Sequence, residues 1–236
     1  MPQGSSFGSL LFVLYTSDLP ATRETTLGTF ADDTVIFATH EGPTIAPLNL
    51  QGHLHIIEKW LKEWKIKFNE SKSSHIMFTL RKGHWPAVDN NQTIIPQTEA
   101  VKYVGLHFDC RLNWKEHIDR KRKQLDLKTK EISWLMGKKS HPSIENKLLI
   151  YQAVIKPIWS YGIELWGCAN KSNIVIMQRS KIPRAIANAL WYVTNHTLHT
   201  DFNIPYISDV IYERINKHHN KLEAHPNPLL QSLLQL

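Results

Sequence analysis

The sequence predicts an α+β protein, in which a small antiparallel sheet with packed helices is followed by a mostly helical second half. Three observations support this prediction. Residues 26–38 have the pattern of strand, tight turn and strand; residues 45–67 carry apolar side chains at helical spacing; and residues 111–139 form a basic, helix-favouring stretch. With 236 residues, of which 42% are hydrophobic, the chain is long enough to fold around a core of its own.

The predicted hairpin carries two adjacent carboxylates, Asp32 and Asp33, at its turn, between runs of β-branched and aromatic residues. Neighbouring carboxylates repel each other unless a cation lies between them, and hard divalent cations such as Mg²⁺ prefer oxygen ligands. Asp also favours turns because its side chain hydrogen-bonds the nearby backbone. A solvated turn is therefore the alternative, and it is the more common meaning of this dipeptide taken alone.

The segments around the hairpin are assigned by their periodicity. The continuously apolar residues 10–15 predict a buried helix, entered from the loop at residues 2–6. Helical spacing predicts an amphipathic helix packed on the sheet, with a buried stripe of Leu54, Ile57, Leu61 and Trp64. Further strands are predicted at residues 75–80 and 94–95, and a hairpin at residues 101–109.

The second half of the chain is dominated by positive charge. Residues 111–139 contain ten lysines and arginines against four carboxylates, which accounts for most of the formal net charge of +7. Ile118, Leu125 and Ile132 recur every seven residues, so a helix with one buried edge is expected, and a second helix after Pro142. The cationic surplus suits a polyanion such as nucleic acid, although a merely solvated helix face is an equally good interpretation.

The remaining features exclude several classes of protein. Cys110 and Cys168 are far apart and have neither disulfide nor zinc-site spacing. His196 and His199 lack further ligands at a suitable spacing, so a metal site is not predicted there. Without a secretory signal or a membrane-length apolar run, we expect an intracellular protein of the nucleus or cytoplasm that is neither secreted nor embedded in a membrane.

Five signals follow one another along the chain in a specific order. They are Pro-Gln-Gly at residues 2–4, Phe-Ala-Asp-Asp at 30–33, Asn-Glu-Ser-Lys-Ser at 69–73, Val-Lys-Tyr-Val-Gly at 101–105, and a basic helical region that ends in residues 156–167. This ordered set resembles the reverse transcriptases of non-LTR retrotransposons, most closely those of jockey-like mobile elements. The resemblance implies three domains: the C-terminal part of a polymerase palm at residues 1–109, a basic helical thumb at 110–170, and a helical or irregular C-terminal connection at 171–236.

The resemblance also implies an activity and a set of residue roles. The activity is that of an RNA-directed DNA polymerase, which adds deoxynucleotides from their triphosphates to a DNA primer on an RNA template by two-metal catalysis, with no obligate protein partner implied. Asp32 and Asp33 match the ligands of Mg²⁺ or Mn²⁺, and Lys72 matches a residue near the leaving pyrophosphate. Contacts with nucleic acid or nucleotide are implied for Gln3, Gly4, Phe30, Ala31, Tyr103, Gly105, Lys121, Arg122 and Lys123.

Each of these residues also has a plainer interpretation when taken alone. Gln3 and Gly4 suit a helix-entry loop, Lys72 a solvated turn, and Tyr103 a core position. The family carries a further palm aspartate before the Pro-Gln-Gly loop, so we expect a C-terminal fragment that is inactive by itself. A non-catalytic nucleic-acid-binding module and a non-functional relic are the alternative hypotheses.

Overall fold

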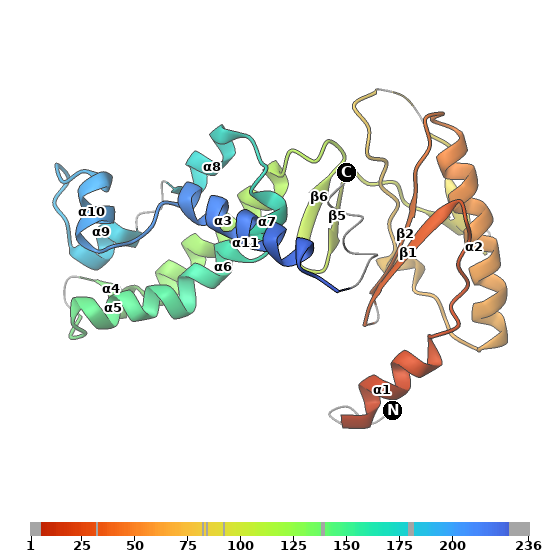
Figure 1. The fold of residues 1–236 in the computed structure, drawn as a ribbon, viewed down its shortest axis with the longest axis horizontal. Helices are drawn as coiled ribbons and strands as arrows, with labels where there is room; N and C mark the ends of the chain where they lie inside the picture. Colours follow the sequence, from red (N-terminus) through yellow and green to blue (C-terminus); the bar gives the residue numbers. More distant parts are fainter. Residues whose placement is uncertain are drawn as a thin grey trace. The chain divides into compact units, whose positions relative to one another are not determined.

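The computed structural model describes residues 6–31, 33–81, 83, 85–91, 93–137, 140–178 and 182–226 (Figure 1). The chain divides into two compact units, residues 1–112 and 113–236. The first combines helices with antiparallel hairpins and the second is built from helices, in agreement with an α+β protein. No helix in the described part of the chain is long and apolar enough to cross a bilayer.

The first unit is organised around an antiparallel hairpin and one long helix. Strands β1 (Thr25–Phe30) and β2 (Asp33–Ala38) pair along their whole length, from Thr25 opposite Ala38 to Phe30 opposite Asp33. Helix α2 (Ile45–Glu63) packs against this hairpin (Figure 1). Leu54 of α2 forms the core with Val88 and Ile95, and Ile36 and Leu50 pack against them. The helix predicted at residues 45–67 is therefore confirmed.

Within the described residues, the strands form three separate two-stranded sheets rather than one palm-like sheet. The other two pairs are β3 (Val88–Asn90) with β4 (Thr93–Ile95), and β5 (Ala100–Tyr103) with β6 (Leu106–Asp109). The short strand expected at residues 94–95 and the hairpin expected at 101–109 are both present.

The strand predicted at residues 75–80 is wrong. His75 makes a single parallel bridge with Gln97, and its backbone N–H donates to the carbonyl of Pro96. Four residues later, the N–H of Thr79 donates to the carbonyl of Cys110 instead. Because the two ends of the segment hydrogen-bond to different parts of the chain, the segment forms no continuous β-ladder with either of them.

Helix α1 (Ser6–Tyr15) confirms the predicted helix but not its burial. Leu10 is 55% exposed, and Val13 and Leu14 are each 61% exposed. The helix is anchored at its C-terminal end, where the Tyr15 hydroxyl donates to the carbonyl of Trp64 at 2.7 Å and the two rings meet edge to face. Apolar composition predicted the element correctly, but burial also requires a partner surface, which composition does not reveal.

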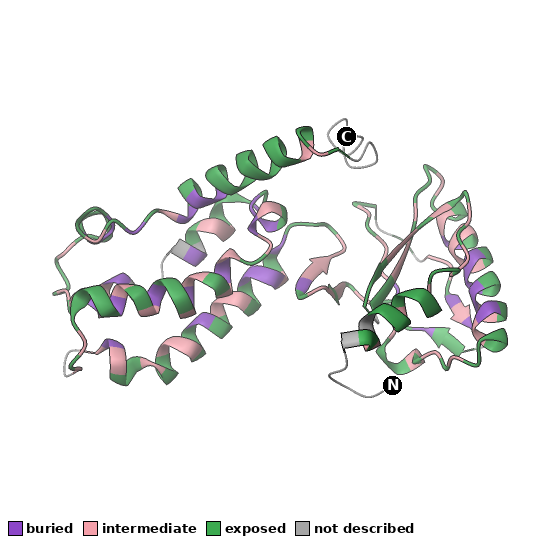
Figure 2. Cartoon of the chain, turned by 60° about the horizontal axis from the view of Figure 1, so that its bottom comes forward, coloured by how far each residue is buried: buried purple, intermediate pink, exposed green. Residues whose placement is uncertain are grey.

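The second unit is helical, and its longest helices among the described residues are α3 and α11. Figure 2 shows buried, intermediate and exposed residues following one another along the helices of the protein. Ile118 and Leu125 of α3 are buried, as the seven-residue spacing predicted, and they belong to a core that includes Ile155, Ile163 and Trp166. In chain order the elements are α3 (Lys115–Glu131), α4 (Ser133–Met136), α5 (Ile144–Ile150), the π-helix η2 (Tyr151–Ile155), α6 (Lys156–Ser160), α7 (Ile163–Trp166), α8 (Lys171–Gln178), α9 (Ile182–Ala187), α10 (Asn195–Asp201) and α11 (Ile207–Glu223).

Candidate active site and nucleic-acid interface

The β1–β2 hairpin has a two-residue connection between Phe30 and Asp33. Ala31, the first residue of this connection, has φ 51°, in the left-handed region that such short hairpin loops require. The Asp33 side chain is exposed at the end of the hairpin. Asp32 lies outside the described residues, as do Gln3 and Gly4.

The two faces of this hairpin have different surroundings. Side chains alternate between the faces of a strand, and residues paired across two strands share a face. Thr25 and Ile36 lie on the face toward α2, where Ile36 joins the core and Thr25 contacts His53. Phe30 and Asp33 are paired on the opposite face, and Phe30 is 60% exposed there. The predicted catalytic carboxylate and its aromatic neighbour thus share the face that α2 leaves uncovered.

Tyr103 reaches this uncovered face from the β5–β6 hairpin. Its hydroxyl lies 3.9 Å from the position that a Cβ on Gly28 would occupy, and Gly28 is on the same face as Phe30 and Asp33. The structure therefore brings Tyr103, one of the predicted nucleic-acid contacts, to the same face of the β1–β2 hairpin as the acidic turn.

Gly105 has a backbone role in the turn of the β5–β6 hairpin. Val104 and Gly105 form its two-residue loop, with φ values of 45° and 74°. Positive φ at both central residues is the type I′ pattern that matches the twist of the flanking strands. Gly adopts this conformation without strain, whereas the β-branched Val104 does so at a steric cost.

His53 fastens the acidic hairpin to α2, and it was missed by the sequence analysis. Its Nε2 lies 2.8 Å from the carbonyl of Pro20, which can only accept, so Nε2 carries the hydrogen. In the neutral ring, Nδ1 then accepts from the Thr25 hydroxyl at 2.6 Å. The available signal was spacing: His53 precedes Ile57 by four residues and Trp60 by seven, which places it on the buried face of the helix.

Lys72 ends the short 3-10 helix η1 (Glu70–Lys72), and its side chain is exposed. Within the part of the chain that the structure describes, no hydrogen bond or ion pair joins it to Asp33. Its role beside the leaving pyrophosphate stays a prediction.

The three consecutive cations predicted to bind nucleic acid point in different directions around α3. Lys121 lies on the packing side, three residues after Ile118, and its Nζ is 5.3 Å from the ring centre of Tyr161. Arg122 is half-buried at the edge of that side, and Lys123 is exposed. Successive helical residues are about 100° apart, so the triplet does not form one binding face.

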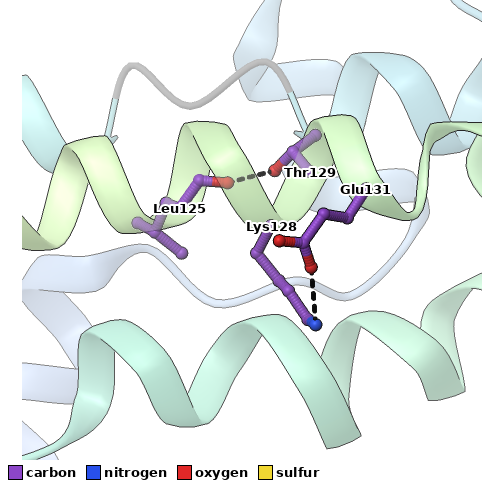
Figure 3. A network of polar contacts seen from close by, with 4 residues as sticks. All are labelled: Leu125, Lys128, Thr129 and Glu131. Carbon is purple, nitrogen blue, oxygen red and sulfur yellow. Dashed lines mark hydrogen bonds and ion pairs between the residues drawn. The ribbon is translucent and has the colours of Figure 1, made fainter.

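Some cations of α3 are neutralised by carboxylates on the same helix. Arg120 pairs with Glu116 at 2.7 Å, and Lys128 pairs with Glu131 at 2.8 Å, beside the hydrogen bond from the Thr129 hydroxyl to the Leu125 carbonyl (Figure 3). Such exposed pairs contribute about 0–1 kcal/mol each to stability. These pairs also reduce the attraction of α3 for a polyanion, because a lysine or arginine paired with a carboxylate adds little net positive charge.

Lys130 and Lys123 share an exposed side of α3 that the sequence analysis had not assembled, and the exposed carboxylates of Asp119 and Asp126 lie on that side as well. Lys130 follows Lys123 by seven residues, so the two exposed lysine side chains lie on the same side of α3, two turns apart. Neither lysine forms a salt bridge within the described residues. The seven-residue interval was the signal in the sequence.

The hairpin turn offers oxygen ligands that suit a hard divalent cation, but the described residues do not form a complete ligand set. Among the described residues, no group of three or more His, Cys, Asp or Glu side chains is placed to hold a metal ion. Mg²⁺ is commonly held by one or two carboxylates together with water and substrate phosphates. The exposed carboxylate of Asp33, at the open end of a hairpin, fits that mode of binding.

Comparison with known proteins gives a family match for the first 108 residues. Residues 1–108 match the family model "Reverse transcriptase (RNA-dependent DNA polymerase)". This segment belongs to the reverse transcriptase family, which confirms the resemblance seen in the order of the motifs.

The particular relatives are polymerases of mobile elements. Over 99% of its length the chain is 34% identical to the probable RNA-directed DNA polymerase from transposon X-element of Drosophila melanogaster. It is 28% identical to the RNA-directed DNA polymerase from mobile element jockey and 30% identical to the probable RNA-directed DNA polymerase from transposon BS, both of the same species and also over 99% of the chain. The chain spans about a quarter of the length of these curated relatives. No solved structure gives a significant match.

Proposed function

We propose that this chain is part of the RNA-directed DNA polymerase of a jockey-like mobile element, and that the end of the β1–β2 hairpin is its catalytic centre. One observation carries the proposal: Asp33 and Phe30 are a cross-strand pair, and both lie on the face of the hairpin that α2 leaves uncovered. The approach of Tyr103 to Gly28 on that side supports it. The names of the similar polymerases supply the activity.

In this proposal Asp32 and Asp33 hold Mg²⁺ or Mn²⁺. Two such ions about 4 Å apart stabilise the attacking and leaving oxygens of an in-line displacement at phosphorus. Phe30 and Ala31 lie beside the primer end, and Lys72 neutralises the departing pyrophosphate. Gln3 and Gly4 contact the template and the incoming nucleotide, and Tyr103 and Gly105 hold the primer.

Metal binding at the hairpin tests this proposal directly. Nitrogen-15 spectra of the chain are recorded during titration with Mn²⁺, whose unpaired electrons broaden nearby amide signals. We expect selective broadening of the amides of Phe30, Ala31 and Thr34, reversed by excess Mg²⁺. Asp33→Asn removes a negative charge from the site. We expect it to raise the Mn²⁺ concentration needed for half-maximal broadening by about tenfold or more.

Asp126→Asn is the matched control, because Asp126 is an exposed carboxylate on α3. It should leave the hairpin signals as they are in the parent protein. Equal broadening of the parent and Asp33→Asn, or broadening spread evenly over surface carboxylates, would contradict the proposed metal site.

A second candidate function is nucleic-acid binding without catalysis, favoured by the shared exposed face of Lys123 and Lys130 on α3. Cations that contact phosphates release counterions, so affinity falls steeply with salt. The double substitution of these lysines by glutamate should weaken binding to an RNA–DNA duplex and lower the salt slope by about two. Asp33→Asn should leave both quantities unchanged.

Lys59 and Lys62 are exposed cations on α2 and provide the matched control for charge. Their replacement by glutamate changes the net charge by the same amount at a different place. If both double variants weaken binding equally, the effect reflects total charge, and the binding face on α3 is refuted.

A further inference from the structure

Two large aromatic side chains protrude from the connection between α9 and α10. Trp191 is 88% exposed and Tyr192 is 64% exposed, and their rings meet edge to face at 5.9 Å. Trp191 is more exposed than any other large hydrophobic residue among those the structure describes. Two large apolar rings exposed together at a loop tip are unfavourable in water, which indicates that they bind a partner.

The loop that carries this pair is rigidly held. Trp191 and Tyr192 are the central residues of a turn that is closed by a hydrogen bond from the Val193 N–H to the Leu190 carbonyl at 3.1 Å. From α9, the guanidinium of Arg184 donates to the carbonyls of Leu190 and Val193, both at 2.7 Å. The two rings are thus presented by a turn that is fixed at both ends, which lowers the entropy lost on binding.

The charge of the sequence that contains this loop indicates the kind of partner. Residues 165–200 contain no aspartate or glutamate, and the four lysines and arginines among them are Lys171, Arg179, Lys181 and Arg184. A stretch of that length without one acidic residue attracts a polyanion. Exposed aromatic rings carried by a basic segment of the chain are the combination with which proteins stack the bases of single-stranded nucleic acids.

We propose that the turn at residues 190–193 is a stacking platform for unpaired bases of a single-stranded nucleic acid. Trp191 provides the larger ring face, Tyr192 supports it edge-on, and Arg184 positions both through the backbone. The proposal does not depend on the polymerase chemistry of the β1–β2 hairpin, because the platform contains none of the residues assigned to that site.

The experiment uses fluorescence anisotropy with labelled single strands of about 12 nucleotides, a length typical of one single-strand binding site. The three probes are oligouridylate, oligothymidylate and an abasic strand with the same number of phosphates. Trp191→Ala should weaken binding of both base-containing strands by about 5- to 150-fold, the range for one base–aromatic stack. It should leave the abasic strand and the salt dependence unchanged.

Two further variants separate stacking from a fold defect. Trp191→Phe keeps an aromatic face and should recover most of the affinity, while Tyr212→Ala removes a 73% exposed aromatic from α11 and should have no effect. Unequal losses for RNA and DNA would show which strand the platform prefers. If Trp191→Ala binds the base-containing strands as the parent does, or loses affinity equally for the abasic strand, base stacking is refuted and the pair is a contact for a protein.

Discussion

The hydroxyl of Thr25 lies 2.6 Å from Nδ1 of His53, and this contact joins the first residue of the acidic hairpin to the buried face of α2. The same hydroxyl lies 2.6 Å from that of Thr22, and the other nitrogen of His53 binds the Pro20 carbonyl. One buried histidine thus secures both β1 and the segment before it. This small network joins the hairpin to α2 in addition to the packing of Ile36 against the core.

We expect Thr25→Val to lower the free energy of unfolding by about 1–3 kcal/mol, because it leaves Nδ1 of the buried His53 without a donor. Thr26→Val is the matched control: Thr26 is the next residue of β1 and its side chain lies on the exposed face. Its effect should stay within about 0.5 kcal/mol. Urea unfolding of both variants measures the difference, and equal effects would show that the network contributes nothing.

Strain in the turn of the β5–β6 hairpin leads to a stabilising substitution. Val104 has φ 45°, and the left-handed region costs an L-residue about 1–2 kcal/mol. Asn tolerates this conformation, and Asn-Gly is the preferred type I′ pair. Val104→Asn should therefore raise the free energy of unfolding by about 1 kcal/mol.

The matched control for that substitution is Val175→Asn on α8, where the valine is 44% exposed and helical. It should give no gain in thermal melting. A loss of stability in Val104→Asn similar to that in Val175→Asn would mean that the turn does not carry this strain.

Two glycines of the first unit should respond to alanine in opposite ways. A Cβ on Gly28 would lie 3.1 Å from Cγ1 of Val35, so Gly28→Ala crowds the face that carries Asp33. At Gly52, on α2, no atom apart from its chain neighbours and the adjacent backbone of the helix lies within 4 Å of the corresponding position. We expect a loss of about 1 kcal/mol at Gly28 from overpacking and a gain of about 1 kcal/mol at Gly52 from helix propensity. Chemical denaturation measures both, and a gain at Gly28 would contradict the crowding.

Acid should destabilise the first unit through His75. Burial lowers the pKa of His75 below its usual value of 6.5. Below pH 6.5 the unfolded chain therefore binds a proton that the native ring does not, so stability is complete above this pH and falls as the pH decreases through it.

His75→Gln removes this contribution, and its stability should decrease less between pH 7.5 and 5.5 than that of the parent. The difference in slope has an upper limit of about 1.4 kcal/mol per pH unit, the value for one proton. Thermal melts across this range measure it. The other twelve histidines are common to both proteins, so parallel curves would contradict a native ring that resists protonation.

Features with a local cause were predictable from the sequence. The alternation around the acidic pair predicted the β1–β2 hairpin, and the period of 3.6 predicted α2 and the basic helix α3. The order of the motifs indicated the family of residues 1–108, and the comparisons confirmed it. The stripe on α2 was right at Leu54 and Ile57, but Trp60 is buried where Trp64 was expected, because α2 ends at Glu63.

Features that depend on contacts between distant residues came from the packed structure. The uncovered face of the β1–β2 hairpin follows from the packing of Ile36 against the core around Leu54, eighteen positions further along the chain. The side chain of Lys121 lies over the ring of Tyr161, whereas Lys123 is exposed to solvent. Both are lysines in the same basic run, so the sequence gives no reason to distinguish them. Periodicity and turn chemistry act over a few residues and so specify elements, whereas the exposure of each face depends on which surface the folded chain brings against it.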